Sequence, residues 1–322
     1  MMTVSRAIKN QAGVGSETRR RILCIAEELG YRPNPLVSAL MAQLRAGRQG
    51  KYVANLAYIN LYQDREFWSR TPTFTKFFNG AQRRAEMLGY GLEHFWLREP
   101  GMTSKRLSKI LLGRGIHGVI VSPAPRGPGH FSFDWPRFAA VTQGFSLARP
   151  NLSRASNHFV HTMRLIYRKL HHLGRQRVAL AITPEMSARS HDIMRAFTVL
   201  YQSAASTKDR VEPYFDGEID PRRFVAWYKR RRPDVIITPF QDALEWLVEA
   251  GVRAPDDVSL VTPDWHAETT PDWAGVDQDL PAVGAAAVDL LVSQLMSNEY
   301  GIPKSPKTLL MEGNWVDGKT LA

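Results

Sequence analysis

The sequence predicts an α/β protein whose body consists of two parallel-sheet lobes, preceded by a small, basic, all-helical segment. Short apolar runs alternate with amphipathic segments from residue 53 to the end of the chain, which is typical of parallel sheets covered by helices. These runs are too many for one small sheet, so two lobes are expected. Ligands of such folds bind in the cleft beside the carboxyl ends of the strands.

Length and charge also indicate more than one structural unit. The chain has 322 residues, a formal net charge of +11 and 44% hydrophobic residues, which is enough for ordinary cores. The first fifty residues hold eight Lys and Arg against three Asp and Glu, so they carry nearly half of the charge excess. A basic segment ahead of a more neutral body favours nucleic-acid binding.

Two helices are predicted in the basic segment. The first spans residues 3–10, and its outer faces carry hydroxyl, guanidinium and amide groups, which reach phosphates and base edges in a DNA groove. The second runs from Ser16, a good N-cap, to Leu29, and Gly30 suits the left-handed residue that ends a helix. The alternative is a solvated helix pair without a partner, and the chemistry alone does not decide between the two.

The body follows a Gly-containing linker at residues 43–51. Strands are predicted at residues 53–59, 90–96, 118–122, 138–143, 177–182, 211–215, 234–238, 258–261 and 309–315. Helices are predicted at residues 74–88, 104–112, 158–173, 190–202, 221–231, 243–250 and 280–296.

The sequence gives no motif of a common enzyme or metal site in the context that such a site needs. A GxGxxG turn after a strand, an HExxH pair and a GxSxG elbow are all missing. The run GNWVDGKT at residues 313–320 fits the phosphate-loop pattern, but no helix is predicted after it. The single cysteine, Cys24, excludes an intramolecular disulfide, fits a reducing compartment and is expected to be partly buried. No apolar stretch reaches about 18 residues, the length of a membrane span. We therefore expect no enzymatic activity, cofactor, metal or membrane partner, and a cytoplasmic location.

The order of residues in the basic segment resembles a known family. The runs TVSRAIKN, SETRRRI and AEELGYRPNPLVSAL are similar to the DNA-binding head of the lactose/galactose/purine repressor family. LGRQRVAL at residues 173–180 and GVRAPDDVSLV at residues 251–261 are similar to segments of that family's body. The resemblance implies a helix-turn-helix head, a hinge helix and a two-lobed, periplasmic-binding-protein-like body. It also implies a homodimeric transcriptional regulator of the repressor type, controlled by a small, sugar-like effector.

The resemblance further implies which residues contact a double-stranded DNA operator. Arg6 would read a base, and Leu40 of the hinge helix would unstack a base step from the minor groove. Phosphate contacts are expected from Thr3, Ser5, Lys9, Asn10 and Thr18. The family has a further helix and a turn before the helix that contains Arg6, and this sequence shows neither. Two explanations stay open: the true start lies upstream of Met1, or the head is truncated and cannot fold.

The same resemblance divides the chain into domains. The expected boundaries are residues 1–34 for the partial head, 35–50 for the hinge helix and linker, 51–157 with 279–306 for the first lobe, and 158–278 with 307–322 for the second lobe. The chain is expected to cross between the lobes near Asn157, Gln278 and Pro306.

The expected effector site lies in the cleft. Asp264 would accept hydrogen bonds from hydroxyl groups, while Phe74, Phe240 and Trp265 would stack on a ring. The alternative places these aromatic residues in the cores and Asp264 in a turn. Pro239-Phe240 stands where the family has an Asn-Asp pair, so the effector is either unusual or absent. A second hypothesis for the whole chain is a soluble small-molecule-binding protein with a vestigial DNA-binding head.

Overall fold

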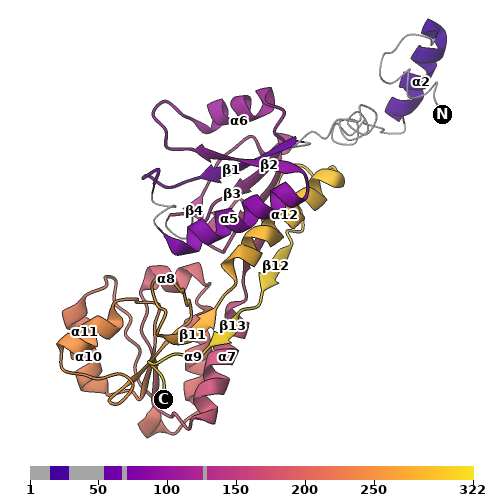
Figure 1. The fold of residues 1–322 in the computed structure, drawn as a ribbon. Helices are drawn as coiled ribbons and strands as arrows, with labels where there is room; N and C mark the ends of the chain where they lie inside the picture. The colour runs from indigo at the N-terminus through magenta and orange to yellow at the C-terminus, as the bar shows by residue number, and fades with distance from the viewer. Residues whose placement is uncertain (1–14, 29–53, 67–70, 126–128) are drawn as a thin grey trace. The chain divides into compact units, whose positions relative to one another are not determined.

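The computed structural model describes residues 15–28, 54–66, 71–125 and 129–322 (Figure 1). The chain divides into two units, residues 1–53 and residues 54–322. The described part of the first unit is the helix α2 (Ser16–Glu28), which begins at the predicted N-cap. Cys24 is exposed on this helix, contrary to expectation, and its Sγ donates to Glu28 Oε1 at 3.6 Å.

The first lobe of the larger unit is built on a six-stranded sheet in the order β12-β7-β5-β3-β1-β2. All neighbouring strands in it run parallel, as the alternation of strands and helices predicts. The strands are β1 (Ala54–Asn60), β2 (Tyr90–Trp96), β3 (Gly118–Val121), β5 (Ala139–Gln143), β7 (Ser153–Asn157) and β12 (Thr308–Met311). One face is covered by α5 (Pro72–Met87) and α12 (Leu280–Met296), and the other by α6 (Ser104–Gly113) (Figure 1).

The second lobe contains a five-stranded sheet in the order β13-β11-β10-β9-β8, in which β13 runs antiparallel to β11. The strands are β8 (Val178–Leu180), β9 (Val235–Ile237), β10 (Ser259–Thr262), β11 (Ala274–Asp277) and β13 (Asn314–Val316). The helices are α7 (Phe159–His172), α8 (Pro184–Arg189), α9 (Ile193–Ala204), α10 (Pro221–Arg231) and α11 (Ala243–Glu249). The strand predicted at residues 211–215 is reduced to a single bridge between Ala181 and Tyr214.

Alternation along the strands fills two core layers in the second lobe. Val178 and Leu180 of β8 pack with the buried side chains of α7, while Ala179 and Ala181 pack with those of α10 and α11. A strand whose successive side chains are buried in two apolar core layers is usually apolar throughout, which explains why the sequence pattern finds the strands of this lobe that read so. None of the helices in the described ranges combines the length and apolar character that a membrane crossing requires.

The last predicted strand, residues 309–315, is two strands in different sheets. β12 pairs with β7 in the first sheet, and β13 pairs with β11 in the second. The third crossing between the lobes therefore falls at Glu312 and Gly313 rather than near Pro306, and residues 308–311 belong to the first lobe. A Cβ on Gly313 would lie 2.5 Å from the carbonyl oxygen of Asp277, so only glycine fits where the chain passes so close to the second crossing.

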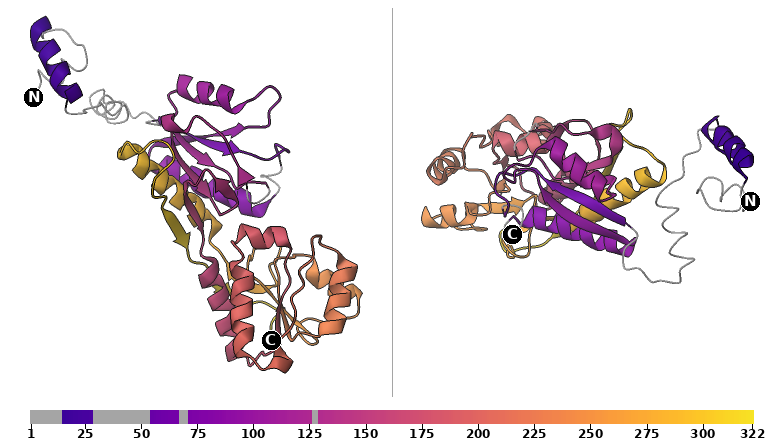
Figure 2. Two further views of the ribbon diagram at one scale, coloured as in Figure 1. Left: turned by 180° about the vertical axis from the view of Figure 1, so that it is seen from behind. Right: turned by 90° about the horizontal axis from the view of Figure 1, so that it is seen from above.

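The helices α5 and α12 touch through their backbones (Figure 2). A Cβ on Gly284 would lie 2.1 Å from the carbonyl oxygen of Phe77, and a Cβ on Gly80 would lie 2.1 Å from that of Pro281. The two glycines thus let α12 hold α5 closely against the sheet. This contact fixes the position of the first turns of α5, which face the second lobe.

Candidate ligand-binding site between the lobes

A cavity of about 590 Å³ lies between the two lobes. Most of its lining follows directly after the carboxyl ends of the strands, as expected for parallel sheets. Tyr62 follows β1, Phe145 follows β5, Pro239 follows β9 and Asp264 follows β10. Both lobes therefore present their strand ends to one common space.

The first lobe gives the cavity an aromatic wall. Phe74 and Phe77 come from the first turns of α5, and Tyr62 lies beside Phe74 with a ring-centroid distance of 5.1 Å. Burial raises the pKa of the Tyr62 phenol, although the positive charge of Arg189 acts in the opposite direction. The phenol is therefore neutral at physiological pH and presents a polar tip on an otherwise apolar surface.

The second lobe contributes every charged side chain in the described lining: Glu185, Arg189 and Asp264. The Arg189 guanidinium donates to the carbonyl oxygen of Pro125 in the first lobe and to Glu185 Oε1 at 3.2 Å. This cation is therefore largely committed to contacts within the protein. Asp264 is different, because one of its oxygens, Oδ1, is buried without a hydrogen-bond partner.

Hydrogen bonds hold the Asp264 backbone in place. Its backbone N–H donates to Thr262 Oγ1 at 3.2 Å, and the next residue, Trp265, donates from its backbone N–H to the carbonyl oxygen of Val276 at 2.9 Å. Asp264 Oδ2 lies 3.4 Å from His266 Nε2. A fixed carboxylate with a free oxygen in a cavity is a ready acceptor for a ligand hydroxyl or N–H group.

Two amide side chains line the cavity where the chain crosses between the lobes. Asn157 Nδ2 donates to Gln278 Oε1, and Gln278 Nε2 donates to the carbonyl oxygen of Pro263. Asn157 and Gln278 are both buried. The buried hydroxyl of Ser156, beside them, has no hydrogen-bond partner, so a second polar atom is left free in the lining.

The structure brings together two of the four residues expected to bind an effector. Phe74 and Asp264 line the cavity, whereas Phe240 and Trp265 do not. Phe240 is only 3% exposed and packs against Tyr214, Phe224 and Trp246 in the core of the second lobe. Trp265 packs against the same core. The structure therefore uses these two rings in the packing of the second lobe and does not place them in the lining of this cavity.

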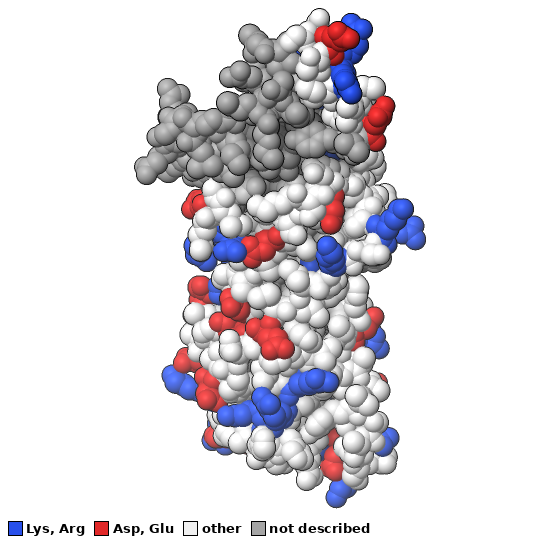
Figure 3. All heavy atoms as spheres, turned by 90° about the vertical axis from the view of Figure 1, so that its right-hand side faces the viewer, with Lys and Arg blue, Asp and Glu red and all other residues white. Residues whose placement is uncertain are grey.

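Of the expected DNA contacts, Thr18 lies within the described residues, where it is exposed on α2. The others, Thr3, Ser5, Arg6, Lys9, Asn10 and Leu40, lie outside them. On the face of the molecule seen in Figure 3, Lys and Arg side chains of the described residues lie among Asp and Glu side chains. The basic excess of the body is thus dispersed on that face instead of forming a continuous stripe.

Sequence reasoning missed several residues of the lining. Phe145 follows β5, and Ser156 and Asn157 belong to β7. The run SRASN of β7 is polar although it is fully buried, so hydropathy gave no signal for a strand. Arg189 ends the short helix α8, which the sequence pattern did not predict, since the predicted helix begins only at residue 190. A search for polar residues directly after each predicted strand would have found Thr183, which follows the strand predicted at residues 177–182. Gln278 follows β11 (Ala274–Asp277), a strand that the sequence pattern did not predict.

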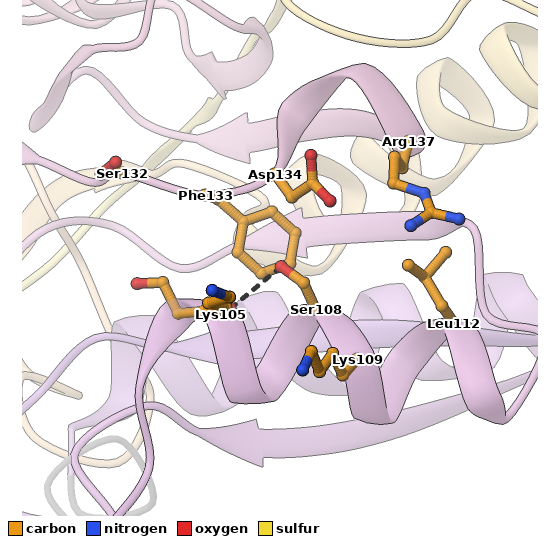
Figure 4. A pocket seen from close by; sticks show the side chains of 9 residues that line it. Lys105, Ser108, Lys109, Leu112, Ser132, Phe133, Asp134 and Arg137 are labelled. Carbon is orange, nitrogen blue, oxygen red and sulfur yellow. Dashed lines mark hydrogen bonds between the residues drawn. The ribbon is translucent and has the colours of Figure 1, made fainter.

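A second depression, of about 500 Å³, lies on the first lobe between α6 and the segment 132–137 (Figure 4). Lys105 and Lys109 of α6 and Arg137 surround it together with Asp134, and Ser108 Oγ donates to the carbonyl oxygen of Ser104 at 2.9 Å. All four charged side chains are exposed, so water screens their attraction for an ion. In the described ranges, no group of three or more His, Cys, Asp or Glu side chains could hold a metal ion.

Two parallel-sheet lobes joined by three crossings around a central cavity define a periplasmic-binding-protein-like fold. Residues 167–321 match the family model of the periplasmic binding protein-like domain, and residues 1–34 match that of bacterial regulatory proteins, lacI family. Together these matches cover more than half of the chain. The chain belongs to the lacI family of transcriptional regulators.

Solved structures share the fold. The transcriptional regulator CelR–cellobiose complex has 19% sequence identity and a TM-score of 0.61, over 99% of this chain and 95% of that chain. The lac repressor dimer bound to operator and the anti-inducer ONPF has 19% identity and a TM-score of 0.59, over 100% and 95%. A periplasmic binding protein/LacI transcriptional regulator from Alkaliphilus metalliredigens QYMF, complexed with D-xylulofuranose, has 14% identity and a TM-score of 0.61, over 83% and 99%. No curated protein matches in sequence.

Proposed function

We propose that this regulator binds a small, sugar-like effector in the cavity between its lobes and that the effector changes its affinity for operator DNA. The observation that carries the proposal is Asp264, which lines a cavity together with Phe74 and Phe77 and whose buried Oδ1 has no hydrogen-bond partner. A sugar presents hydroxyl groups at its edge and C–H groups on its face. An acceptor combined with an aromatic wall suits both kinds of surface.

Two relatives support the sugar class, because their structures hold cellobiose and D-xylulofuranose. The cavity volume of about 590 Å³ also falls within the range of small-molecule sites. Asp264 would accept from hydroxyl groups, Phe74 and Phe77 would contact the ring, and Gln278 and Ser156 would complete the polar contacts.

The proposed mechanism couples two sites through lobe closure. An effector that binds better to the closed arrangement shifts the population towards it. In a homodimer, closure would change the spacing of the two first lobes and of the DNA-binding segments that precede them, so that effector and operator alter each other's affinity. Arg6 and Leu40 would carry base reading and DNA bending, and Thr3, Ser5, Lys9, Asn10 and Thr18 the phosphate contacts.

The first experiment is a thermal-shift screen of the full chain with cellobiose, D-xylulose and related sugars, followed by calorimetry on each sugar that stabilises it. A bound sugar should raise the melting temperature, and the stabilisation should grow with the logarithm of its concentration once that concentration exceeds its Kd. The second experiment measures binding to genomic DNA fragments, with and without that sugar, at two salt concentrations.

The two experiments separate the candidate functions. Specific DNA binding that the sugar alters supports the regulator, with Arg6→Ala losing sequence discrimination and Leu40→Ala losing DNA bending. Sugar binding without any preference for a genomic fragment supports a receptor whose DNA-binding head is vestigial. A screen in which no sugar stabilises the protein contradicts the proposed effector class.

A further inference from the structure

Four side chains form a continuous series of contacts that begins at the cavity and connects the second lobe to the first. Asp264 Oδ2 lies 3.4 Å from His266 Nε2, and His266 Nδ1 lies 3.3 Å from Lys76 Nζ. Lys76 Nζ in turn lies 2.9 Å from Glu268 Oε2. Lys76 belongs to α5 in the first lobe, whereas the other three residues follow β10 in the second lobe.

The chemistry of these groups determines which atom donates in each contact. A lysine ammonium has hydrogen-bond donors and no acceptor, so His266 Nδ1 must accept from Lys76. In the neutral ring the proton then lies on Nε2, and this N–H group faces Asp264 Oδ2 at 3.4 Å, an electrostatic contact longer than a normal hydrogen bond. The imidazole thereby adjoins one oxygen of the Asp264 carboxylate, while the other oxygen, Oδ1, has no hydrogen-bond partner.

The surroundings of His266 keep the ring in one position. Its side chain is only 2% exposed, its backbone N–H donates to Thr270 Oγ1 at 3.0 Å, and its carbonyl oxygen accepts from the backbone N–H of Thr270 at 2.8 Å. A buried ring on a closed turn has few alternative orientations. The Lys76 side chain is 25% exposed and comes from the helix that also carries Phe74 and Phe77 into the cavity.

We propose that His266 is a positioning residue that links the ligand-accepting Asp264 to Lys76 across the cleft. The inference rests on the proposed function for the role of Asp264, and it adds a means by which occupancy of the cavity and closure of the lobes are coupled. When the lobes separate, Lys76 leaves Nδ1 of the ring. The proton is then free to lie on either nitrogen, and Asp264 loses a fixed donor. The closed arrangement and the binding-competent carboxylate therefore stabilise each other.

The first test measures the separation of the lobes without any ligand. Spin labels are attached through Lys109→Cys on α6 and Glu249→Cys on α11, two exposed positions, in a Cys24→Ser background. Lys76→Met removes the cation that bridges the lobes and keeps an apolar stem of similar length. We expect the population of the open arrangement to rise by about fivefold, with a longer and broader distance distribution. Lys105→Met, a change of an exposed lysine on α6 that is not one of the four residues of the contact chain, is the matched control and should leave the distribution unchanged.

The second test separates the two nitrogens of His266. In His266→Gln the amide replaces the Nε2 donor to Asp264 but not the acceptor for Lys76, and His266→Asn favours the reverse. His266→Gln should therefore open the lobes as Lys76→Met does. His266→Asn should keep the distance distribution of the wild type and lower the affinity for cellobiose, or for whichever sugar of the screen binds, by about tenfold.

The outcomes distinguish this inference from the proposed function. If Lys76→Met and His266→Gln both keep the wild-type distance distribution, the contact chain is not a link between the lobes and the inference is wrong, whatever the sugar screen gives. If no sugar binds but both variants open the lobes, the sugar class fails and the link stands. Equal losses of affinity in the Gln and Asn variants, with no change in distance, would reduce His266 to a packing residue.

Discussion

The two walls of the cavity differ in chemistry although similar parallel sheets build both. In the described lining, the first lobe contributes aromatic rings, hydroxyls and prolines, whereas Glu185, Arg189 and Asp264 all come from the second lobe. One wall is therefore suited to the face of a ligand and the other to its polar edge. A ligand that needs both surfaces is held fully only when the lobes are together, which makes closure sensitive to its presence.

The lobes also differ in how their helices are packed. In the first lobe, α5 and α12 meet backbone to backbone at Gly80 and Gly284. In the second lobe, the layer formed by α10 and α11 is filled by large side chains, among them Phe224, Trp227 and Phe240. The first wall depends on close helix contact, and the second on aromatic volume.

The largest effect is expected from Gly284→Ala. The added Cβ would lie 2.1 Å from the carbonyl oxygen of Phe77 and 2.7 Å from the backbone nitrogen of Ala81, and backbone cannot move aside as a flexible side chain can. We expect the free energy of unfolding to fall by about 3 kcal/mol and the melting temperature by roughly 10 °C. Calorimetry of the wild type and the variant measures both.

Gly113→Ala is the matched control, because Gly113 ends α6 and has nothing within 4 Å of an added Cβ. It should be neutral or stabilise the protein by about 0.5 kcal/mol, through the better helix propensity of alanine. Equal losses of stability in both alanine variants would show that the contact of α5 with α12 is not special to the first lobe.

The next largest effect concerns the polar wall. Asp264→Asn keeps the shape of the side chain but removes the charge of the free acceptor. If Asp264 accepts from a ligand hydroxyl, the affinity for a sugar that binds the wild type should fall roughly ten- to a hundredfold. Titration calorimetry gives the Kd, and an unchanged value would remove Asp264 from the proposed site.

Two phenylalanines separate the aromatic wall from the aromatic core. Phe74→Leu should lower the affinity for the same sugar by about three- to tenfold, because Phe74 lines the cavity, and should change stability little. Phe240→Leu should do the opposite. It should lower the free energy of unfolding by about 1 to 2 kcal/mol, because Phe240 is 3% exposed in the core, and leave the affinity unchanged. Affinity lost in Phe240→Leu alone would reverse the assignment of the two rings.

The contrast between Phe74 and Phe240 also shows which part of the site can be predicted from the sequence: the secondary-structure elements, but not the direction of each ring. Strong periodicity predicts α12 and β2 with the boundaries that the structure has, because a long apolar helix and a strand bounded by glycine and turn residues have few alternatives. Both phenylalanines adjoin predicted elements near the cleft, yet only the packing of Tyr214, Phe224 and Trp246 decides that Phe240 points into the core. That packing is long-range and leaves no mark in the local pattern.

Long-range pairing explains the other differences as well. The buried run SRASN of β7 is polar, and it becomes a strand because β5 and β12 pair with it on either side. The run at residues 308–316 reads as one strand until Gly313 carries it from one sheet to the other. Nothing in the local sequence singles out His266, because its contact with Lys76 joins residues that lie 190 positions apart in the chain.

The smallest effect is expected at Glu268, the exposed partner of Lys76 in the contacts between the two walls. The hydrogen bond from Lys76 holds the pKa of Glu268 below its ordinary value, so the folded state favours the charged carboxylate. Its contribution to stability is therefore present above the ordinary pKa of glutamate and is lost as the pH falls through the lowered folded-state pKa. Glu268→Gln tests this contribution. The Glu268 side chain is 60% exposed, so we expect the change to lower the melting temperature by at most about 2 °C at neutral pH. The difference from the wild type should shrink as the pH falls through the lowered pKa of Glu268, below which both side chains are neutral, because all other titrating groups are common to the two proteins. A difference that stays constant across this pH range would mean that the charge of Glu268 contributes nothing to stability.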